Sequence, residues 1–455
     1  MPTASEFWND VALDANKEDH SHTAREAGGP VYSARALAMV HAAMADAYAN
    51  AHGAGGGGTP FMPAFVTDTP PGVALPEAAL GGAAHAVLSA IHTWQRPAFD
   101  ARRDAFLSHL LSLPGNTPQA VQGGWDFGQT IGRAILDLRK DDGSADPTNG
   151  NQASGYAPGG LNGMHAADPL NPDQGFYGWH FGKVAPFVLE AHEVLEMMPP
   201  PPPQTHEKRY LDDLAEVYVK GRKDPAGRTQ EQTDIGVFWA YDGVKGLGTP
   251  PRLYNQVLRR VCEAEPKALT ETDWVALLAR FHLALADAGI VAWQAKYLCN
   301  VWRPVVGIRE HVPIPGRPDA PKDPAWVPLG APASNGGKDF TPPFPAYPSG
   351  HATFGAAGFT VLKRFLRDHR GGGDDGNTVN LTFTSDELDG VTKESDGVMP
   401  RPESPQTFAT IDEMIEKNLE SRVWLGVHWR FDGELGSNSG AKVGRKVAGA
   451  VYQTT

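Results

Sequence analysis

The sequence predicts an all-α protein made of helical bundles, with two bundle-like halves joined by long loops rich in glycine and proline. Three observations support this prediction. Most of the periodic segments carry apolar residues at the 3.6-residue spacing of a helix. Segments with the strict alternation of a half-buried strand are scarce. The chain of 455 residues contains 51 glycines and 39 prolines, which favour long structured loops between the helices.

Four segments with an apolar stripe lie early in the chain, at 33–50, 77–94, 100–113 and 120–140. The glycine-rich stretch 53–58 and the segment 141–176, dense in Gly, Asn, Pro and Asp, are expected to be connections. The sequence MMPPPPPQ (197–204) cannot be helical and predicts a stiff spacer. We therefore expect an N-terminal helical half over 1–198, a polyproline connector over 199–204 and a C-terminal helical half over 205–455.

The second half resumes with helical patterns at 207–221, 229–241 and 252–265. A long helix is expected from about Glu271 to Trp302, and another is expected to open at Ser349. GGGDDG (371–376) predicts a further loop. No fixed-period repeat is visible, so the pattern favours bundles rather than a solenoid.

Charge and composition exclude several classes of protein. The formal net charge of −13 argues against a nucleic-acid surface or an anionic membrane as partner. The sequence contains no run of eighteen consecutive apolar residues, so no membrane span is expected. The first twenty residues lack the basic and apolar segments of a secretory signal. The two cysteines, Cys262 and Cys299, fit no metal-binding spacing and are expected to pack as small apolar residues.

The segment TPPFPAYPSGHATFG (341–355) places Ser349, Gly350 and His351 at the start of a predicted helix. The first turn of a helix exposes unpaired N–H groups and the positive end of the dipole, so it favours an anion. The alternative is an ordinary N-cap serine with a histidine beside it.

A second motif lies at the end of the long predicted helix, in WQAKYLCNVWRPVVG (293–307). Lys296 and Arg303 are seven residues apart, so on one helix they lie within about 20° of each other, and Pro304 is expected to end that helix. Neighbouring aromatic residues suggest burial, and two buried cations need a counter-charge. The alternative is a solvated stripe of positive charge.

The third motif is LESRVWLGVHWRFD (419–432). On an unbroken helix Arg422 and His428 would lie about 120° apart, but Gly426 offers a break that could redirect the histidine. Asp432, four residues after His428, could hold one imidazole nitrogen so that the other faces the site as a base or ligand. A purely structural His–Asp pair is the alternative.

Read in order, the motifs are K-x6-R-P, P-S-G-H and S-R-x5-H-x3-D. This combination resembles the signature shared by type 2 phosphatidic acid phosphatases, bacterial acid phosphatases and vanadium-dependent haloperoxidases. The flanking sequences PPFPAYPSGHATFG and WQAKYLCNVWRP are similar to the fungal-type vanadium chloroperoxidases, as are FWNDVALDANKEDH near the start and FWAYDGVKGLGTPPRLYNQ in the middle. The chain is shorter than those enzymes, and 141–176 and 371–405 need not align with them.

The resemblance implies that the site binds vanadate or phosphate. Lys296, Arg303 and Arg422 would supply three cations for the oxygens of the anion, and arginine does so as a bidentate fork. Ser349 and the backbone N–H of Gly350 would add donors. Each charge-assisted hydrogen bond is worth about 1.5–3 kcal/mol.

The resemblance also assigns the remaining site residues. His428 would bond to vanadium or phosphorus, and His351 would be the acid–base group on the opposite side. Asp432 would orient His428, and Asp242 in FWAYDG would orient Arg422. Trp293 and Phe344 would line a dry halide pocket, with plain core packing as the alternative; an aromatic residue at the position of Phe344 accompanies chloride oxidation in the family, and histidine there accompanies bromide-only enzymes.

The expected function is therefore that of a vanadate-dependent haloperoxidase. Vanadate would activate hydrogen peroxide as a Lewis acid, so that chloride or bromide is oxidised to hypohalous acid, which halogenates small organic acceptors. Phosphate is expected to occupy the site when vanadate is absent. One alternative is an acid phosphatase in which His428 forms a phosphohistidine and His351 protonates the leaving group. A non-catalytic oxyanion-binding protein is the other, although it would not require an acid–base histidine.

Overall fold

The computed structural model describes residues 2–56, 65–70, 72–145, 155–160, 162–241, 243–312, 320–333, 339–394 and 397–452. This part of the chain contains 14 α-helices and one sheet of two strands, which confirms the all-α prediction. Before the polyproline connector the helices are α1 (Ala4–Ser21), α2 (Pro30–Gly56), α3 (Pro76–Ile91), α4 (Arg96–Ser112), α5 (Pro118–Arg139) and α6 (Ala191–Met197).

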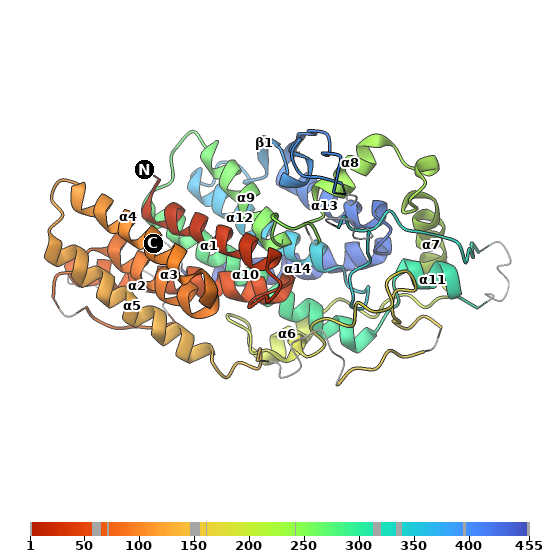
Figure 1. Cartoon of the computed structure of the whole chain (residues 1–455), viewed down its shortest axis with the longest axis horizontal. Helices are drawn as coiled ribbons and strands as arrows, with labels where there is room; N and C mark the ends of the chain where they lie inside the picture. Colours follow the sequence, from red (N-terminus) through yellow and green to blue (C-terminus); the bar gives the residue numbers. More distant parts are fainter. Residues whose placement is uncertain are drawn as a thin grey trace.

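After the connector the helices are α7 (Lys208–Lys220), α8 (Gln230–Phe238), α9 (Pro250–Glu263), α10 (Glu271–Cys299), α11 (Pro304–Glu310), α12 (Gly350–His369), α13 (Ile411–Trp424) and α14 (Arg430–Ala450). Strands β1 (Thr378–Phe383) and β2 (Gln406–Thr410) pair antiparallel, with Leu381 opposite Phe408. The elongated molecule has α2 to α5 at one end and α7 and α11 at the other (Figure 1).

Helix α10 is the central element of the fold. A capping box formed by Thr270 and Asp273 starts it, and every residue from Trp274 to Trp293 is buried. It packs against α2, α12 and α14. Among the described residues it is the one helix long and apolar enough to cross a membrane, and its most apolar window is wholly buried. A helix that is apolar all round is a core helix when other helices cover it, as they do here.

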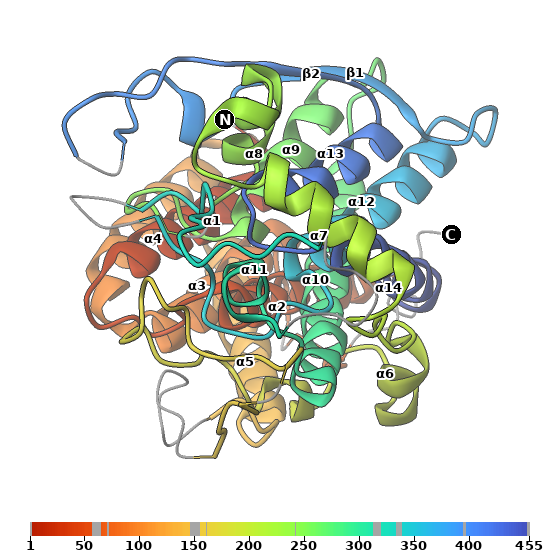
Figure 2. The same ribbon diagram turned by 90° about the vertical axis from the view of Figure 1, so that its right-hand side faces the viewer.

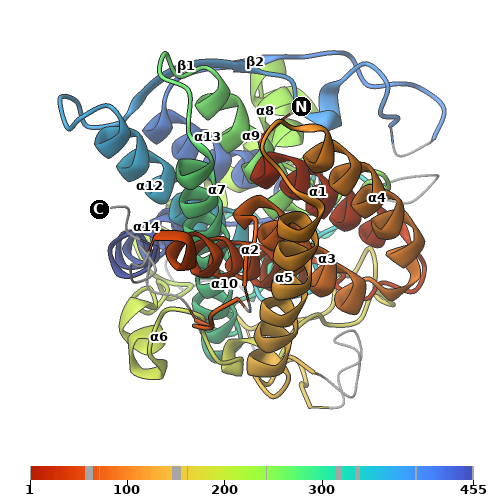
Figure 3. The same ribbon diagram turned by 90° about the vertical axis from the view of Figure 1, so that its left-hand side faces the viewer.

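Glycines allow the helices of each end to approach closely. On α5, a Cβ atom at Gly128 would lie 1.9 Å from the carbonyl oxygen of Ala79 in α3. On α14, a Cβ at Gly440 would lie 2.1 Å from the carbonyl oxygen of Thr353 in α12. Figure 3 shows the first contact region, among α1 to α5, and Figure 2 shows the second, where α12, α13 and α14 gather. The second contact sets the position of the start of α12.

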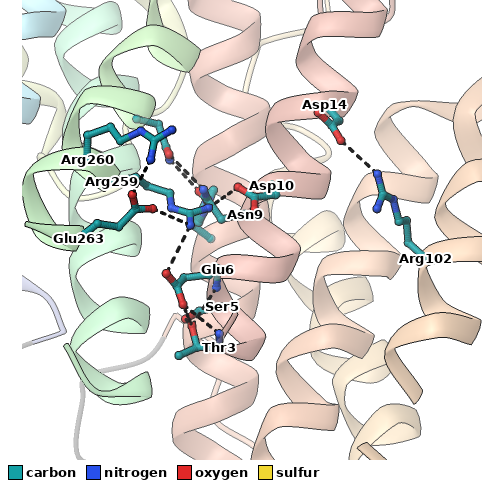
Figure 4. Close-up of polar contacts among 12 residues, drawn as sticks. Thr3, Ser5, Glu6, Asn9, Asp10, Asp14, Arg102, Arg259, Arg260 and Glu263 are labelled. Atoms are coloured by element: carbon teal, nitrogen blue, oxygen red, sulfur yellow. Dashed lines mark hydrogen bonds and ion pairs between the residues drawn. The ribbon is translucent and has the colours of Figure 1, made fainter. Parts of the chain in front are cut away.

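Helix α1 has no counterpart among the predicted elements. Thr3 and Glu6 form a capping box at its start, and its buried face joins the core. Arg259 of α9 pairs with Glu6 and Asp10 on α1, and Arg102 of α4 pairs with Asp14 (Figure 4). These ion pairs attach α1 to helices on both sides, although pairs near the surface add little net stability.

The predicted helix from Glu271 to Trp302 is wrong at its end. Helix α10 stops at Cys299, and Asn300 adopts the left-handed conformation with φ +54°. Arg303 is then the N-cap of α11, and Pro304 lies in the first turn of that new helix instead of ending the old one. Asparagine tolerates positive φ, and proline suits the first turn of a helix, so the local sequence favours this break. Lys296 and Arg303 therefore come from two helices, not from one face of one helix.

The polyproline segment 199–204 has no regular structure and lies between α6 and α7. The carbonyl oxygen of Pro200 accepts a hydrogen bond from the hydroxyl of Tyr347. The connector is thereby attached to the segment that precedes α12. The predicted loop 371–376 is observed. Of the predicted connection 53–58, α2 extends through Gly56. The described residues do not include 57–58, nor 146–154 and 161 of the predicted connection 141–176.

Candidate active site

Lys296 lies in the last turn of α10, and its side chain is fully buried. The ammonium group donates hydrogen bonds to the carbonyl oxygens of Pro345 at 2.8 Å, Ala346 at 3.1 Å and Pro348. Because carbonyl oxygens only accept, these contacts stabilise the charged form of the lysine. They also fix the segment 344–348 against the end of α10, which brings Phe344 and the start of α12 to the same place.

Arg303 joins three parts of the site. Its Nε donates to the carbonyl oxygen of Phe344 at 2.8 Å, and its Nη1 donates to the carbonyl oxygen of Val427 at 2.7 Å. The same Nη1 lies 2.9 Å from Nε2 of His428. Arg303 as a whole is 1% exposed. A buried, rigid and permanently charged group is thus held beside the imidazole.

The start of α12 forms a positive helix terminus in the site. Ser349 is the N-cap, and its side chain accepts from the N–H of Ala352. The N–H of Ser349 donates to the carbonyl oxygen of Asp432 at 2.9 Å, which ties this turn to α14. A Cβ atom at Gly350 would lie 3.3 Å from the indole ring of Trp293. The first turn of α12 is therefore packed next to Trp293.

His428 lies in the break between α13 and α14, where Gly426 has φ +70°. The expected interruption at Gly426 is thus observed. Nδ1 of His428 lies 3.0 Å from Oδ2 of Asp432, which also accepts from the N–H of Trp429 at 3.0 Å. Arginine can only donate, so Nε2 of His428 accepts from Arg303, and the ring hydrogen is on Nδ1. Nε2 is therefore the nitrogen that faces the cations, and its lone pair is engaged by Arg303, so a metal bound at Nε2 would replace this hydrogen bond.

Burial is the main cause that holds the pKa of His428 well below its usual value, and the charges of Arg303, Lys296 and Arg422 lower it further. Burial raises the pKa of Asp432, while the Trp429 N–H and the charges of Lys296 and Arg303 act in the opposite direction and favour the carboxylate. The imidazole is therefore neutral. A neutral imidazole, whose unprotonated nitrogen carries a lone pair, is the form that binds a metal.

His351 lies in the first turn of α12 and is 6% exposed. Its Nε2 is 2.8 Å from the carbonyl oxygen of Ala240, so Nε2 carries the hydrogen and donates. Burial, followed by the charge of Arg422, holds the pKa of His351 well below its usual value. The neutral ring thus has an unprotonated Nδ1, which can accept a proton.

Arg422 completes the set of cations from the last turn of α13, where its side chain is fully buried. Its charge lowers the pKa of both His428 and His351, so it lies close to both rings. Asp242, which was expected to orient Arg422, lies outside the described residues.

Aromatic rings cover one side of the cations. The ring of Phe344 has its centroid 5.0 Å from Nζ of Lys296 and 4.8 Å from Cζ of Arg303. Trp293 lies 4.9 Å from Phe344 between ring centroids, and its indole Nε1 is buried without a hydrogen-bond partner among the described residues. Cations over aromatic faces in a dry site gain from the ring quadrupole.

The three buried cations, two neutral imidazoles and the helix terminus converge on one region. Burying three positive charges together is costly unless an anion offsets them. Donors of this kind suit a compact tetrahedral oxyanion, and Nε2 of His428 adds one ligand for its central atom. The donor set therefore fits vanadate.

His165 is a further residue of this region that the sequence did not reveal. It lines a pocket together with Arg303, Phe176 and Thr341, and the charges of Arg303 and Lys296 add to burial in lowering its pKa to about 3. Its Nδ1 lies 2.8 Å from the hydroxyl of Tyr156, which donates to Asn300 at 2.6 Å. His165 lies in the irregular segment 141–176, far from every motif, so spacing gave no signal.

The fold and the site together define a class, that of helical-bundle proteins with a buried cluster of cations and histidines. A model of the vanadium chloroperoxidase (VCPO) N-terminal domain matches residues 5–173, and a model of the VCPO second helical-bundle domain matches residues 276–455. The vanadium chloroperoxidase of Curvularia inaequalis is 32% identical over 483 residues, which cover 94% of this chain and 78% of that protein. The chain belongs to the vanadium chloroperoxidase family, and it is a vanadate-dependent haloperoxidase.

Solved structures share this fold. The crystal structure of a bacterial vanadium-dependent iodoperoxidase has a TM-score of 0.72 at 21% identity and covers 97% of this chain and 95% of its own. A holo-type bacterial vanadium-dependent chloroperoxidase has a TM-score of 0.67 at 15% identity and covers 97% and 96%. The family membership favours the haloperoxidase over the acid phosphatase that the three motifs alone left open.

Proposed function

We propose that Lys296, Arg303 and Arg422 bind the oxygens of vanadate, with Lys296 exchanging one of its three carbonyl contacts for a vanadate oxygen, and that Ser349 and the N–H of Gly350 add donors at the start of α12. The observation that carries this proposal is the burial of all three cations, each at most 1% exposed, around one neutral histidine. Bound vanadate supplies a Lewis acid that polarises hydrogen peroxide toward attack by a halide.

His428 is the proposed ligand of vanadium, through Nε2. The hydrogen bond from Nδ1 to Asp432 fixes the tautomer and the ring orientation, and vanadium bound at Nε2 would take the place of the hydrogen bond from Arg303. Asp432 acts on the metal only through the ring. Its carboxylate raises the basicity of the imidazole, as such partners do in other metal sites.

His351 is the proposed acid–base group. With Nε2 held by the carbonyl of Ala240, Nδ1 is the atom that takes up a proton from hydrogen peroxide and later returns it during product formation. The three cations disfavour a charged imidazole. An oxyanion bound among them offsets their charge and raises the pKa of His351, so that proton uptake depends on occupancy of the site.

Trp293 and Phe344 are proposed to line the halide pocket. Both rings are buried and lie next to Lys296, and the Nε1 of Trp293 offers an N–H without a partner among the described residues. Desolvation in such a pocket makes a halide a better nucleophile. Because Phe344 occupies the position where an aromatic residue accompanies chloride oxidation, we propose that the enzyme oxidises chloride as well as bromide.

We further propose that residues 205–455 form the helical half that carries the vanadate site, with 1–198 as a covering half and 199–204 as their connector. Every proposed contact to vanadate comes from the second half. The first half contributes His165 and covers α10 through α2.

One experiment tests the cofactor proposal. Protein dialysed against a chelator is titrated with orthovanadate, and loss of monochlorodimedone is followed with hydrogen peroxide and either bromide or chloride. We expect activity only with vanadate, and competition by inorganic phosphate, which we propose occupies the site of the apoprotein. Bromide oxidation by vanadate-free protein, undiminished by excess phosphate, would contradict the proposal. Efficient turnover of p-nitrophenyl phosphate, without any halide oxidation on adding vanadate, would favour the phosphatase.

A further inference from the structure

Three potential metal ligands from separate segments meet at the end of α1. Asp19 lies in the last turn of α1, Glu26 lies in the loop that follows, and His92 is the C-cap of α3. Their ligand atoms all lie within 4.8 Å of one another. We propose that Asp19, Glu26 and His92 form a binding site for a divalent cation of the Zn²⁺ type, separate from the vanadate site.

The state of His92 points to a ligand. The residue is 3% exposed, and its Nδ1 has no hydrogen-bond partner among the described residues. Buried polar atoms are almost always hydrogen-bonded, so this nitrogen calls for an explanation. Its neighbour Oδ1 of Asp19 lies 3.7 Å away, which is too long for a hydrogen bond. With a cation about 2.1 Å from both atoms, the angle between the two ligand bonds would be about 120°, within the range of a distorted tetrahedron.

Asp19 is already oriented for this role. Its carboxylate is buried, with Oδ1 accepting from the N–H of Glu26 at 2.8 Å and Oδ2 from the N–H of Ala27 at 3.0 Å. Each carboxylate oxygen has a second lone pair, so these bonds leave room for a cation. Hydrogen bonds of this kind hold metal-binding carboxylates in place.

Glu26 supplies a third ligand from the surface. Its side chain is exposed, and Oε1 accepts from the hydroxyl of Thr93, next to His92. One imidazole and two carboxylates neutralise a doubly charged ion. Nitrogen and oxygen ligands together suit Zn²⁺ better than Ca²⁺ or Mg²⁺, which prefer oxygen alone, and water would complete the coordination. Such an ion would link α1, the following loop and the end of α3.

Zinc chloride titrated calorimetrically into chelator-treated full-length protein tests the site. We expect one Zn²⁺ per chain, a rise in melting temperature on binding, and at least about tenfold weaker affinity in both His92→Gln and Glu26→Gln. His85→Gln is the matched control, because His85 is another buried histidine of α3 paired with a carboxylate, Asp100, at 2.9 Å. Its zinc affinity should equal that of the parent.

The parent protein failing to bind zinc would overturn the proposal, as would unchanged affinity in Glu26→Gln, whose exposed side chain can be replaced without disturbing the fold. Zinc bound instead at the proposed vanadate site, by His428, would be lost in His428→Ala and kept in His92→Gln. That result would also overturn the proposal. Loss in His92→Gln with retention in His428→Ala supports it. The outcome does not depend on haloperoxidase activity.

Discussion

Replacing Asp432 by asparagine tests how the protein tunes the proposed vanadium ligand. The side chain accepts from Nδ1 of His428 and from the N–H of Trp429, both at 3.0 Å, and the substitution keeps one oxygen of nearly the same shape but removes the charge. A hydrogen bond to a charged group contributes about 1.5–3 kcal/mol, against about 0.5–1.5 kcal/mol for a neutral one. The backbone carbonyl of residue 432 still accepts from Ser349, so the start of α12 stays in place.

We therefore expect Asp432→Asn to bind vanadate about 10–100-fold more weakly, which is about 1.4–2.7 kcal/mol. Calorimetric titration of the apoprotein with orthovanadate measures this loss. Glu434→Gln is the control: it removes the same charge two residues away, in an exposed pair with Arg209, and should leave the affinity unchanged. In the same assay His428→Ala should show no binding at the concentrations used. An affinity of Asp432→Asn equal to the parent, or an equal loss in Glu434→Gln, would refute the reasoning.

Three further predictions concern other buried groups. His351→Ala should retain measurable bromide oxidation while chloride oxidation falls much further, since acid–base groups contribute about 10²–10⁴-fold and chloride is harder to oxidise; an equal drop in steady-state kinetics with both halides would show that His351 does not discriminate. Burial raises the pKa of Asp46 to about 7, so the stability that its protonated form contributes is present below the unfolded pKa of about 4 and is lost as the pH rises through 7. The free energies of unfolding of the parent and Asp46→Asn, measured with urea, should therefore diverge by up to about 4 kcal/mol between pH 4 and 8. Parallel dependence of the two free energies on pH would contradict this. His165→Phe should bind vanadate as the parent does, because the histidine is uncharged with a pKa of about 3, but should lose about 1 kcal/mol of stability with the hydrogen bond to Tyr156; a calorimetric loss above tenfold would assign His165 a direct role.

Helical periodicity predicted most of the fold because helices such as α5 and α7 bury regular apolar stripes. It missed α1, whose buried face is interrupted by buried polar residues such as Asn9 and Asn16. It also extended α10 past Cys299, because Val301 and Trp302 are apolar and continue the pattern. The left-handed turn at Asn300 is decided by one residue and by contacts with the distant segment near His165, which no local pattern contains.

The three motifs stood out in the sequence because each is short and lies at a helix end, where capping chemistry leaves a signal, and the roles of their residues remain predictions from the family resemblance. Ser349 as N-cap and the break at Gly426 are examples. The hydrogen bonds that fix the tautomers of His351 and His428 could not be predicted, since they come from Ala240 and Arg303, which are more than 100 residues away along the chain. Contacts of that kind depend on how the helices pack.

The bond between the N–H of Ser349 and the carbonyl of Asp432 has a consequence for biosynthesis. It joins two turns that are more than eighty residues apart in the sequence. Arg303 likewise donates to the carbonyl of Val427, which lies far downstream of it in the chain. During translation, Lys296 and Arg303 leave the ribosome well before these partners do. The centre can therefore close only after residue 432 has been made, and we expect vanadate to enter the folded protein rather than the growing chain. Apoprotein produced in cells without vanadium should accordingly be complete and ready to load afterwards.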